Sequence, residues 1–455
     1  RTVSGIAVIF RLDDRPPAPE ALWAMLEASA YRGPDGGYAE FLGPVALGYL
    51  HMAIAPEEVH ETQPLVSPLT GCAIVADARI DNREEMLSRL RHSISRNSSD
   101  AHIILRAYEE WGEQAVSMLL GDFALMIWDP RRQRLLCARD SAGRRELYYR
   151  SNSREFVAAS DLHQLMQDPS VPVLPNPDKV HTFLLPSSVL SSEKQEAATY
   201  YEGLWSVEPG SLLVVEQGHV SSKRYWDLRP PHEIRYRRES DYAEHFLDLF
   251  AESVRARLRS SHKVGLLLSG GLDSSSIACM VQLLYRTGRA QHNGFATFST
   301  VYEGLECDER PLIAEIQDMY GFEAHFLSPG GYAGRLQLEP AGFQVAPNMG
   351  MSEGWDIIMG AAKSAGVKVL LTGDLADACI AGSPLVFDSL VRHGGWRELL
   401  RRLQAYRKMS GAPLLNTLLW DCGVPLLPIA LQRWLMAKHV LRAAPRSPER
   451  LLPDW

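Results

Sequence analysis

The residue types best suited to chemistry gather at residues 264–276, which read V-G-L-L-L-S-G-G-L-D-S-S-S. The apolar start predicts a buried strand, the two glycines predict a sharp turn, and the serines before further apolar residues predict the start of a helix. Such a turn presents free backbone N–H groups and the positive end of a helix dipole, which favour an anion and above all a phosphate. We therefore interpret these positions as contacts for a phosphate-bearing ligand: Leu267, Ser269, Gly270, Gly271 and Ser274.

Two features of this loop limit the kind of phosphate ligand and the kind of cation that we expect it to bind. The loop is not of the G-x-x-x-x-G-K-[ST] type, so no lysine follows that would grip a transferring γ-phosphate. Asp273 would repel a phosphate unless a cation lay between them, and Mg²⁺ bridging a carboxylate and phosphate oxygens meets that need. The complete string resembles the pyrophosphate loop of N-type ATP pyrophosphatases, which cleave ATP between the α and β phosphates. ATP and Mg²⁺ are therefore the expected ligands.

Composition excludes several other classes of protein. The chain has 455 residues, 46% of them hydrophobic and 22% charged, with a net charge of −8, so nonspecific binding to nucleic acid or acidic membranes is not favoured. It contains no apolar run of about 18 residues that would span a membrane, and we expect that its first residues, which soon become charged, are not a signal peptide. Six scattered cysteines without a C-x-x-C pair favour buried thiols. We expect a cytoplasmic protein of two or three domains.

The second half of the chain must position the loop. A long amphipathic helix is expected over residues 241–260, before the strand that leads into the loop. Further strands are predicted at 295–301, 324–327 and 367–372, and helices at about 274–287, 309–320 and 353–365. This alternation predicts a parallel sheet with helices on both faces and the ligand at the carboxyl ends of the strands. The region after residue 384 is expected to be wholly helical.

Two more strand ends in this half carry polar groups. Ser299 and Thr300 end the predicted strand 295–301. The segment L-T-G-D-L-A-D-A at 371–378 ends another strand, and its acids Asp374 and Asp377 are three residues apart, on one side of a helical turn. Acids are common at helix N-termini for electrostatic reasons alone. Their place downstream of the phosphate loop favours a functional role.

The first half of the chain is predicted to be mostly β. Short strands are expected at 4–10, 45–50, 71–80, 124–129, 134–140 and 147–150, with helices near residues 22–30 and 101–111. The proline pair at 230–231 marks a boundary. We therefore expect one domain over residues 1–228 and a second over residues 229–455.

A series of motifs in the first half resembles the glutamine-dependent asparagine synthetases. The motifs are S-G-I-A, Y-R-G-P-D-G, Q-P-L (63–65), D-N-R-E-E (81–85), G-D-F-A (121–124), I-W-D (127–129), A-R-D (138–140) and L-Y-Y (147–149). The resemblance implies an α+β Ntn-hydrolase (glutaminase-like) sandwich of sheets between helices. It also implies an α/β synthetase domain of the adenine nucleotide alpha hydrolase type with a parallel sheet, followed by a helical tail.

The resemblance also assigns roles in the second half. The segment at 371–378 is similar to the S-G-[DE]-x-x-D-E segment of asparagine synthetases, so Asp377 is expected to join Asp273 as the Mg²⁺ pair. It implies that Thr372 and Gly373 line the nucleotide, that Ser299 and Thr300 contact adenosine, and that Asp374 lies near the reacting centre. Lys438 and Lys408 are candidates for a cation near an acyl-adenylate, although a solvated helix lysine is the commoner explanation for each.

The glutaminase half departs from the family at several points. The family's nucleophile is a cysteine at the mature N-terminus, whereas Ser4 stands here with Val3 before it, so we expect no free α-amine to act as base. The family's N-G-E motif reads Asp77, Ala78 and Arg79 here, and the arginine of its R-L-x-I segment is missing, since residues 50–54 read L-H-M-A-I. We infer a structural remnant of a glutaminase domain that produces no ammonia.

Without ammonia, the amine is expected to belong to the substrate, which points to intramolecular amide closure. Two families with this layout carry out that reaction: the β-lactam synthetases and the lasso-peptide macrolactam cyclases. The stretch R-Y-W-D-x-x-P-x-x-E-I-R-Y, with E-C-D-E-R-P further on, resembles the second. That resemblance implies a precursor peptide as substrate, with a leader-recognition protein and a leader peptidase as partners. The alternatives are a β-lactam-type synthetase, an ammonia-fed asparagine synthetase and a non-catalytic scaffold.

Overall fold

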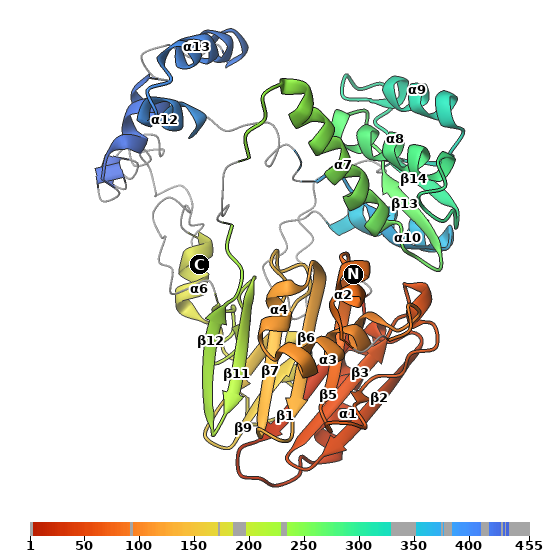
Figure 1. Ribbon diagram of the computed structural model, residues 1–455, viewed down its shortest axis with the longest axis vertical. Coiled ribbons are helices and arrows are strands. Elements are labelled where there is room, and N and C mark those ends of the chain that lie inside the picture. The colour runs from red at the N-terminus through yellow and green to blue at the C-terminus, as the bar shows by residue number, and fades with distance from the viewer. Residues whose placement is uncertain are drawn as a thin grey trace, which may run out of the picture. The chain divides into compact units, whose positions relative to one another are not determined.

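The computed structural model describes most of the chain (Figure 1). The described residues are 3–91, 94–171, 173–184, 197–228, 234–328, 352–374, 376, 385–410, 418–428, 431–432 and 434–435. They form two compact units, one containing residues 1–177 and 194–372 and the other containing residues 178–193 and 373–455. The expected boundary near residue 228 falls within the first unit and stays a prediction.

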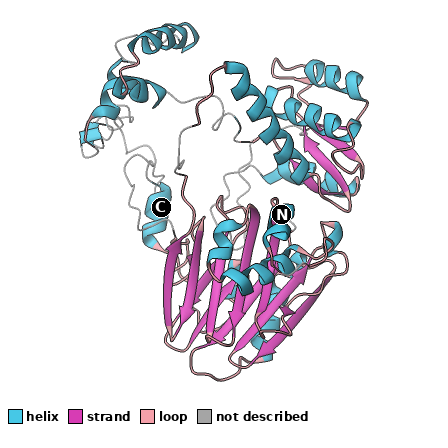
Figure 2. Ribbon diagram, in the orientation of Figure 1, coloured by secondary structure: helices cyan, strands magenta, loops and turns pink. Residues whose placement is uncertain are grey.

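The N-terminal part of the first unit contains two six-stranded antiparallel sheets (Figure 2). The first has the order β10-β8-β9-β1-β3-β2 and the second has the order β12-β11-β7-β6-β5-β4. Their strands are β1 (Gly5–Arg11), β2 (Gly36–Leu42), β3 (Val45–His51), β4 (Leu65–Val66), β5 (Ala73–Ile80), β6 (Gly121–Asp129), β7 (Arg134–Arg139), β8 (Tyr148–Ser151), β9 (Glu155–Ala159), β10 (Trp205–Ser206), β11 (Ser211–Glu216) and β12 (His219–Arg224).

Alternation along the strands places apolar side chains on both faces of each sheet. Ile6 and Val8 of β1 pack with Val75, Met126 and Trp128 of the second sheet, so this core lies between the sheets. The outer face of the first sheet packs against α1 (Pro19–Ala28) and α5 (Leu162–Leu165). The outer face of the second packs against α2 (Arg83–Arg89), α3 (Asp100–Trp111) and α4 (Gln114–Met118). The predicted sandwich of sheets between helices is confirmed.

The rest of the first unit contains a four-stranded parallel sheet with the order β15-β14-β13-β16. Its strands are β13 (Lys263–Leu267), β14 (Phe295–Thr300), β15 (Glu323–Leu327) and β16 (Val367–Leu371). Val264 and Leu266 face α7 (Glu239–Arg257), α8 (Leu272–Arg286) and α9 (Arg310–Tyr320). Phe298 and Leu370 face α10 (Ser352–Ser364). The parallel sheet with helices on both faces is therefore also confirmed.

The described residues after 384 are mainly helical, as expected. They form α12 (Leu385–Arg392), α13 (Trp396–Ser410), a π-helix (Leu418–Gly423) and a 3₁₀-helix (Val424–Leu426), and α12 and α13 pack through Phe387, Leu399 and Leu403. In the described part of the chain we find no helix that is both long and apolar enough to cross a membrane. Cys72, Cys137 and Cys422 are buried thiols, but Cys307 is exposed, so the expectation of buried cysteines was wrong for that residue.

Gly121 provides a test of this fold. Its φ is +148°, and an added Cβ would lie 2.0 Å from the carbonyl oxygen of Arg79 on the neighbouring strand. Gly121→Ala should therefore destabilise the protein by at least about 3 kcal/mol, because backbone atoms would have to move. At Gly43, where φ is +63° but an added Cβ would meet no atom within 4 Å, the same change should cost only about 1 kcal/mol. Urea unfolding measures both variants, and equal losses would contradict the described β5–β6 pairing.

Candidate functional site

The turn between β13 and α8 is held in shape by Ser274. The buried Ser274 hydroxyl donates to the carbonyl oxygen of Ser269 at 2.9 Å, and its oxygen accepts the backbone N–H of Ser269 at 3.1 Å. The Ser269 and Ser274 hydroxyls also lie 3.0 Å apart. Ser274 is therefore engaged within the loop, whereas Ser269 and Gly271 are exposed.

A carboxylate already lies at one N–H group of this loop. The Gly270 N–H donates to Glu309 Oε2 at 3.2 Å. Glycine is needed there because an added Cβ would lie 2.8 Å from Leu312 Cβ on α9. Beyond the loop, the N–H groups in the first turn of α8 have no intrahelical acceptor, as at any helix start. The loop therefore accepts an oxyanion, and its donors fit a phosphate.

The carboxyl ends of three neighbouring strands bring most of the predicted residues to one edge of the sheet. β13 lies between β14 and β16, so the loop after β13 is flanked by Ser299 and Thr300 of β14 and by Thr372 after β16. Ser299 is buried and Thr300 half-buried. The side chain of Leu267 packs against the core on the α10 face, so Leu267 would have its backbone available for a nucleotide. These placements agree with a nucleotide site, and the individual contacts stay predictions.

The roles of the remaining predicted residues stay predictions. Gly373 and the exposed Asp374 belong to the second compact unit. Asp377 and Lys438 lie outside the described residues. Lys408 is exposed in the last turn of α13.

Asp273 is the described residue that could hold Mg²⁺. It lies half-buried in the first turn of α8, beside the donors that fit a phosphate. Among the described residues no three His, Cys, Asp or Glu side chains gather as a metal-binding group. Mg²⁺ characteristically takes one or two carboxylates and completes its shell with phosphate oxygens and water. Asp273 fits that pattern, and its pairing with Asp377 stays a prediction.

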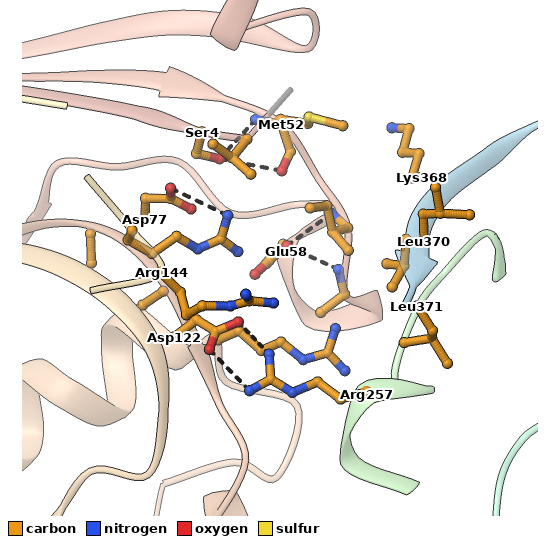
Figure 3. Close-up of a pocket in the computed structure, with 18 of the residues that line it drawn as sticks. Ser4, Met52, Glu58, Asp77, Asp122, Arg144, Arg257, Lys368, Leu370 and Leu371 are labelled. Carbon is orange, nitrogen blue, oxygen red and sulfur yellow. Dashed lines mark hydrogen bonds and ion pairs between the residues drawn. The ribbon is translucent and has the colours of Figure 1, made fainter. Parts of the chain in front are cut away.

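The Ser4 hydroxyl is used for structure at the start of β1. It accepts the backbone N–H of Met52 at 3.2 Å, donates to the Met52 carbonyl oxygen at 3.3 Å and lies 3.3 Å from the Tyr49 hydroxyl (Figure 3). Burial, reinforced by the negative charge of Glu61, raises the pKa of Tyr49 well above its ordinary value, so this phenol stays neutral. Within the described chain no histidine, lysine or carboxylate side chain hydrogen-bonds to Ser4 Oγ, so we find no base beside it.

The three residues at the family's N-G-E positions lie near the end of β5. Asp77 is buried, and its carboxylate lies 3.6 Å from the guanidinium of Arg145. Burial raises the pKa of Asp77, although the charges of Arg145 and Arg32 act in the opposite direction. Ala78 offers no polar side-chain atom, and Arg79 donates to the carbonyl oxygen of Ala256 at the end of α7. The N-G-E motif has a side-chain amide at its first position and a carboxylate at its third. Asp77 and Arg79 do not supply these groups at the corresponding positions.

A cavity of about 850 Å³ extends from Ser4 to Thr372 within the first unit (Figure 3). Its walls come from the N-terminal sandwich, α7 and β16, and Arg144 points into it. Sequence reasoning missed several of its charged lining residues: Glu58, Glu61, Asp122, Arg144, Arg145, Arg257 and Lys368. The dense acids of residues 57–61 and the Arg144–Arg145 pair were visible signals, but nothing in their spacing indicated a shared cavity.

Glu61 makes the cavity sensitive to pH. Burial raises its pKa from 4.5 to about 7, against hydrogen bonds from Ser99 and Gln63 that favour the charged form. Ionising Glu61 therefore costs more free energy in the folded protein than in the unfolded chain. This loss of stability grows from about pH 4.5 to about pH 7 and then stays constant.

Glu61→Gln should remove this cost. The free energy of unfolding of the variant, relative to the unchanged protein, should rise between pH 5 and pH 8 by up to about 3 kcal/mol. Urea unfolding at several pH values measures the difference. Ser88→Ala, which alters an exposed side chain that does not titrate, should show a nearly constant difference. A constant difference for Glu61→Gln as well would contradict the raised pKa of Glu61.

Comparisons with known proteins support this architecture. A glutamine amidotransferase domain matches residues 3–226, and an asparagine synthase domain matches residues 245–425. The amidase chry2 of Gibberella zeae is 25% identical over 457 residues, covering 96% of this chain and 66% of the relative. Asparagine synthetase [glutamine-hydrolyzing] 2 of Bacillus subtilis is 27% identical over 263 residues, covering 56% of this chain and 35% of the relative.

A solved structure is also similar. The glutamine phosphoribosylpyrophosphate amidotransferase of B. subtilis, complexed with ADP and GMP, aligns with a TM-score of 0.36 and 14% identity, covering 82% of this chain and 91% of that one. The fold assignment rests on the sheet topology and the two matched domains. The chain spans 66% and 35% of the lengths of the two sequence relatives described above. With both domains present in order, it belongs to the asparagine synthetase-like family.

Proposed function

We propose that this protein is an ATP-dependent, AMP-forming amide ligase of the cytoplasm that closes a peptide ring. It adenylates the side-chain carboxylate of an Asp or Glu in a precursor peptide and joins it to that peptide's own α-amine. The proposal rests on a contrast between the phosphate loop and the Ser4 site, which both belong to the first unit. The phosphate loop is ordered for an oxyanion, whereas the Ser4 hydroxyl is bound to the Met52 backbone without a base.

The first step would occur at the edge that carries the phosphate loop. A carboxylate oxygen of the substrate attacks the α-phosphorus of ATP, and the bond from that phosphorus to the bridging oxygen breaks. The backbone N–H groups of the first turn of α8 hold the departing pyrophosphate. Asp273 and the predicted ligand Asp377 would hold Mg²⁺, which would neutralise charge on the phosphate oxygens.

The second step forms the amide. The peptide's α-amine attacks the activated carbonyl carbon, and the bond from that carbon to the AMP oxygen breaks. The amine loses a proton in this step, and Asp374 is the candidate acceptor. Because both reacting groups belong to one molecule, binding that folds the peptide supplies much of the rate acceleration.

The choice of a peptide rests on the sequence motifs shared with lasso-peptide cyclases. A leader-recognition protein and a leader peptidase are the partners this choice implies. The arginines Arg392, Arg397, Arg401 and Arg402 of the helical region after residue 384 are the proposed contacts for an acidic part of a peptide, and Arg401 and Arg402 also pair with Glu398.

Transfer of free ammonia to aspartate is the second candidate function. It is favoured by the cavity, because a continuous space runs from Ser4 to Thr372 at the end of β16. An ammonia-fed enzyme could use such a space without a working glutaminase. A β-lactam-type synthetase would carry out the same two steps on a small molecule.

Product analysis distinguishes these functions. The protein is incubated with ATP, Mg²⁺ and either the precursor peptide or aspartate with ammonium chloride. We expect AMP and a peptide lighter by one water, and no glutamate when glutamine is supplied. Asp273→Ala should lower the rate at least about 100-fold because the metal and pyrophosphate lose a ligand. Asp318→Ala, which changes an exposed acid of α9, is the matched control and should leave the rate unchanged.

Three outcomes would contradict parts of the proposal. AMP formed only with aspartate and ammonium would favour the second candidate. Full activity of Asp273→Ala would remove Asp273 from the site. Glutamate released from glutamine would show that the N-terminal domain still works as a glutaminase.

A further inference from the structure

A cluster of opposite charges joins the N-terminal sandwich to the C-terminal end of α7. Among the described residues it contains four arginines and four acids, so its formal charge is zero. The members are Arg79, Arg83, Arg257, Arg259, Glu57, Asp81, Asp100 and Asp122. We call this set the junction cluster.

Arg257 and Arg259 bring the positive charges of the α7 end into the cluster. Arg257 pairs with Asp122 and lies 3.0 Å from Asp81, while Arg259 pairs with Asp100 and lies 3.3 Å from Glu57. The carboxylate of Asp100 is almost fully buried. Removing one member would leave a partner buried and uncompensated, which is strongly unfavourable.

Arg79 differs from the other members because it also binds the backbone of α7. Its guanidinium donates to the carbonyl oxygen of Ala256, in the last turn of the helix, and its Nε lies 3.6 Å from Asp81. The last four carbonyl groups of a helix have no intrahelical donor, and a cation there also complements the helix dipole. Burial and the charge of Arg259 lower the pKa of Arg79 to about 10, so it remains protonated near neutral pH.

The segment after α7 leads directly to the phosphate loop. The Ser261 backbone N–H and side-chain hydroxyl both donate to the Ile54 carbonyl oxygen, at 2.8 and 2.9 Å, and β13 begins two residues later. Val254 of α7 packs in one core with Ala278 and Val281 of α8, the helix that follows the loop. The position of the end of α7 therefore affects both sides of the turn at Ser269–Gly271.

We propose that Arg79 is a positioning residue, which fixes the end of α7 against the N-terminal sandwich and thereby sets the geometry of the phosphate loop. Arg79 stands where the family's N-G-E motif has its glutamate. In this chain its side chain contacts α7, which belongs to the C-terminal domain. The N-terminal domain then supports the ligase site without processing glutamine. This inference rests on the proposed function in one respect, namely that the loop binds pyrophosphate.

Binding of inorganic pyrophosphate with Mg²⁺ to the full chain tests this role. Isothermal titration calorimetry is carried out on the unchanged protein and on Arg79→Met, Arg79→Glu and Arg79→Lys, well below each melting temperature. Arg79→Met should weaken binding about tenfold and Arg79→Glu more, whereas Arg79→Lys should recover most of the affinity because its ammonium can still bind the Ala256 carbonyl oxygen. Arg154→Glu, an exposed charge reversal on the same sandwich, should bind as the unchanged protein does.

The outcomes separate the two proposals. If the unchanged protein binds pyrophosphate and Arg79→Met binds it equally well, the positioning role is wrong while the phosphate loop stands. If the unchanged protein binds no pyrophosphate, the proposed function and the positioning role both fail. Should Arg79→Glu not fold, Arg79→Met and its recovery by Arg79→Lys decide the question. A loss of affinity that Arg79→Lys does not recover would also overturn the role of the cation.

Discussion

The hydrogen bonds between Ser274 and the backbone of Ser269 are the interaction on which the site depends. They close the turn between β13 and α8, so that the loop N–H groups and the start of the helix face the same ligand. The carboxylate of Glu309 at the Gly270 N–H shows which kind of atom this turn accepts. The two core layers of the parallel sheet and the contacts at the end of α7 hold this turn in place.

The N-terminal sandwich keeps the architecture of a glutamine amidotransferase domain while its side chains serve other purposes. Ser4 binds the backbone that continues β3, Asp77 lies opposite Arg145, and Arg79 contacts α7. A domain that packs against its neighbour through buried charge pairs contributes to the stability of the whole unit, whether or not it processes glutamine.

Local patterns made much of this structure predictable. Short apolar runs located β1, β3 and β5, and the S-G-G-L-D-S-S string located the turn before α8 within two residues. Long-range contacts were not predictable, because nothing near Arg79 indicates that it meets Ala256, which lies 177 positions further on. Ser274 was predicted to contact the phosphate-bearing ligand, and the structure shows that its hydroxyl hydrogen-bonds to the backbone of the loop. The charge state of Glu61 depends on burial that only the folded chain creates.

Transfer of oxygen from the peptide carboxylate to AMP tests the central claim most directly. The precursor peptide is labelled with ¹⁸O in the side-chain carboxylate that closes the ring, and the nucleotide product is analysed by mass spectrometry. Adenylation at the phosphate loop predicts AMP that carries one ¹⁸O atom, because the bond broken in ring closure joins the carbonyl carbon to the shared oxygen. Unlabelled AMP, or label found in inorganic phosphate with ADP as the nucleotide product, would contradict this account.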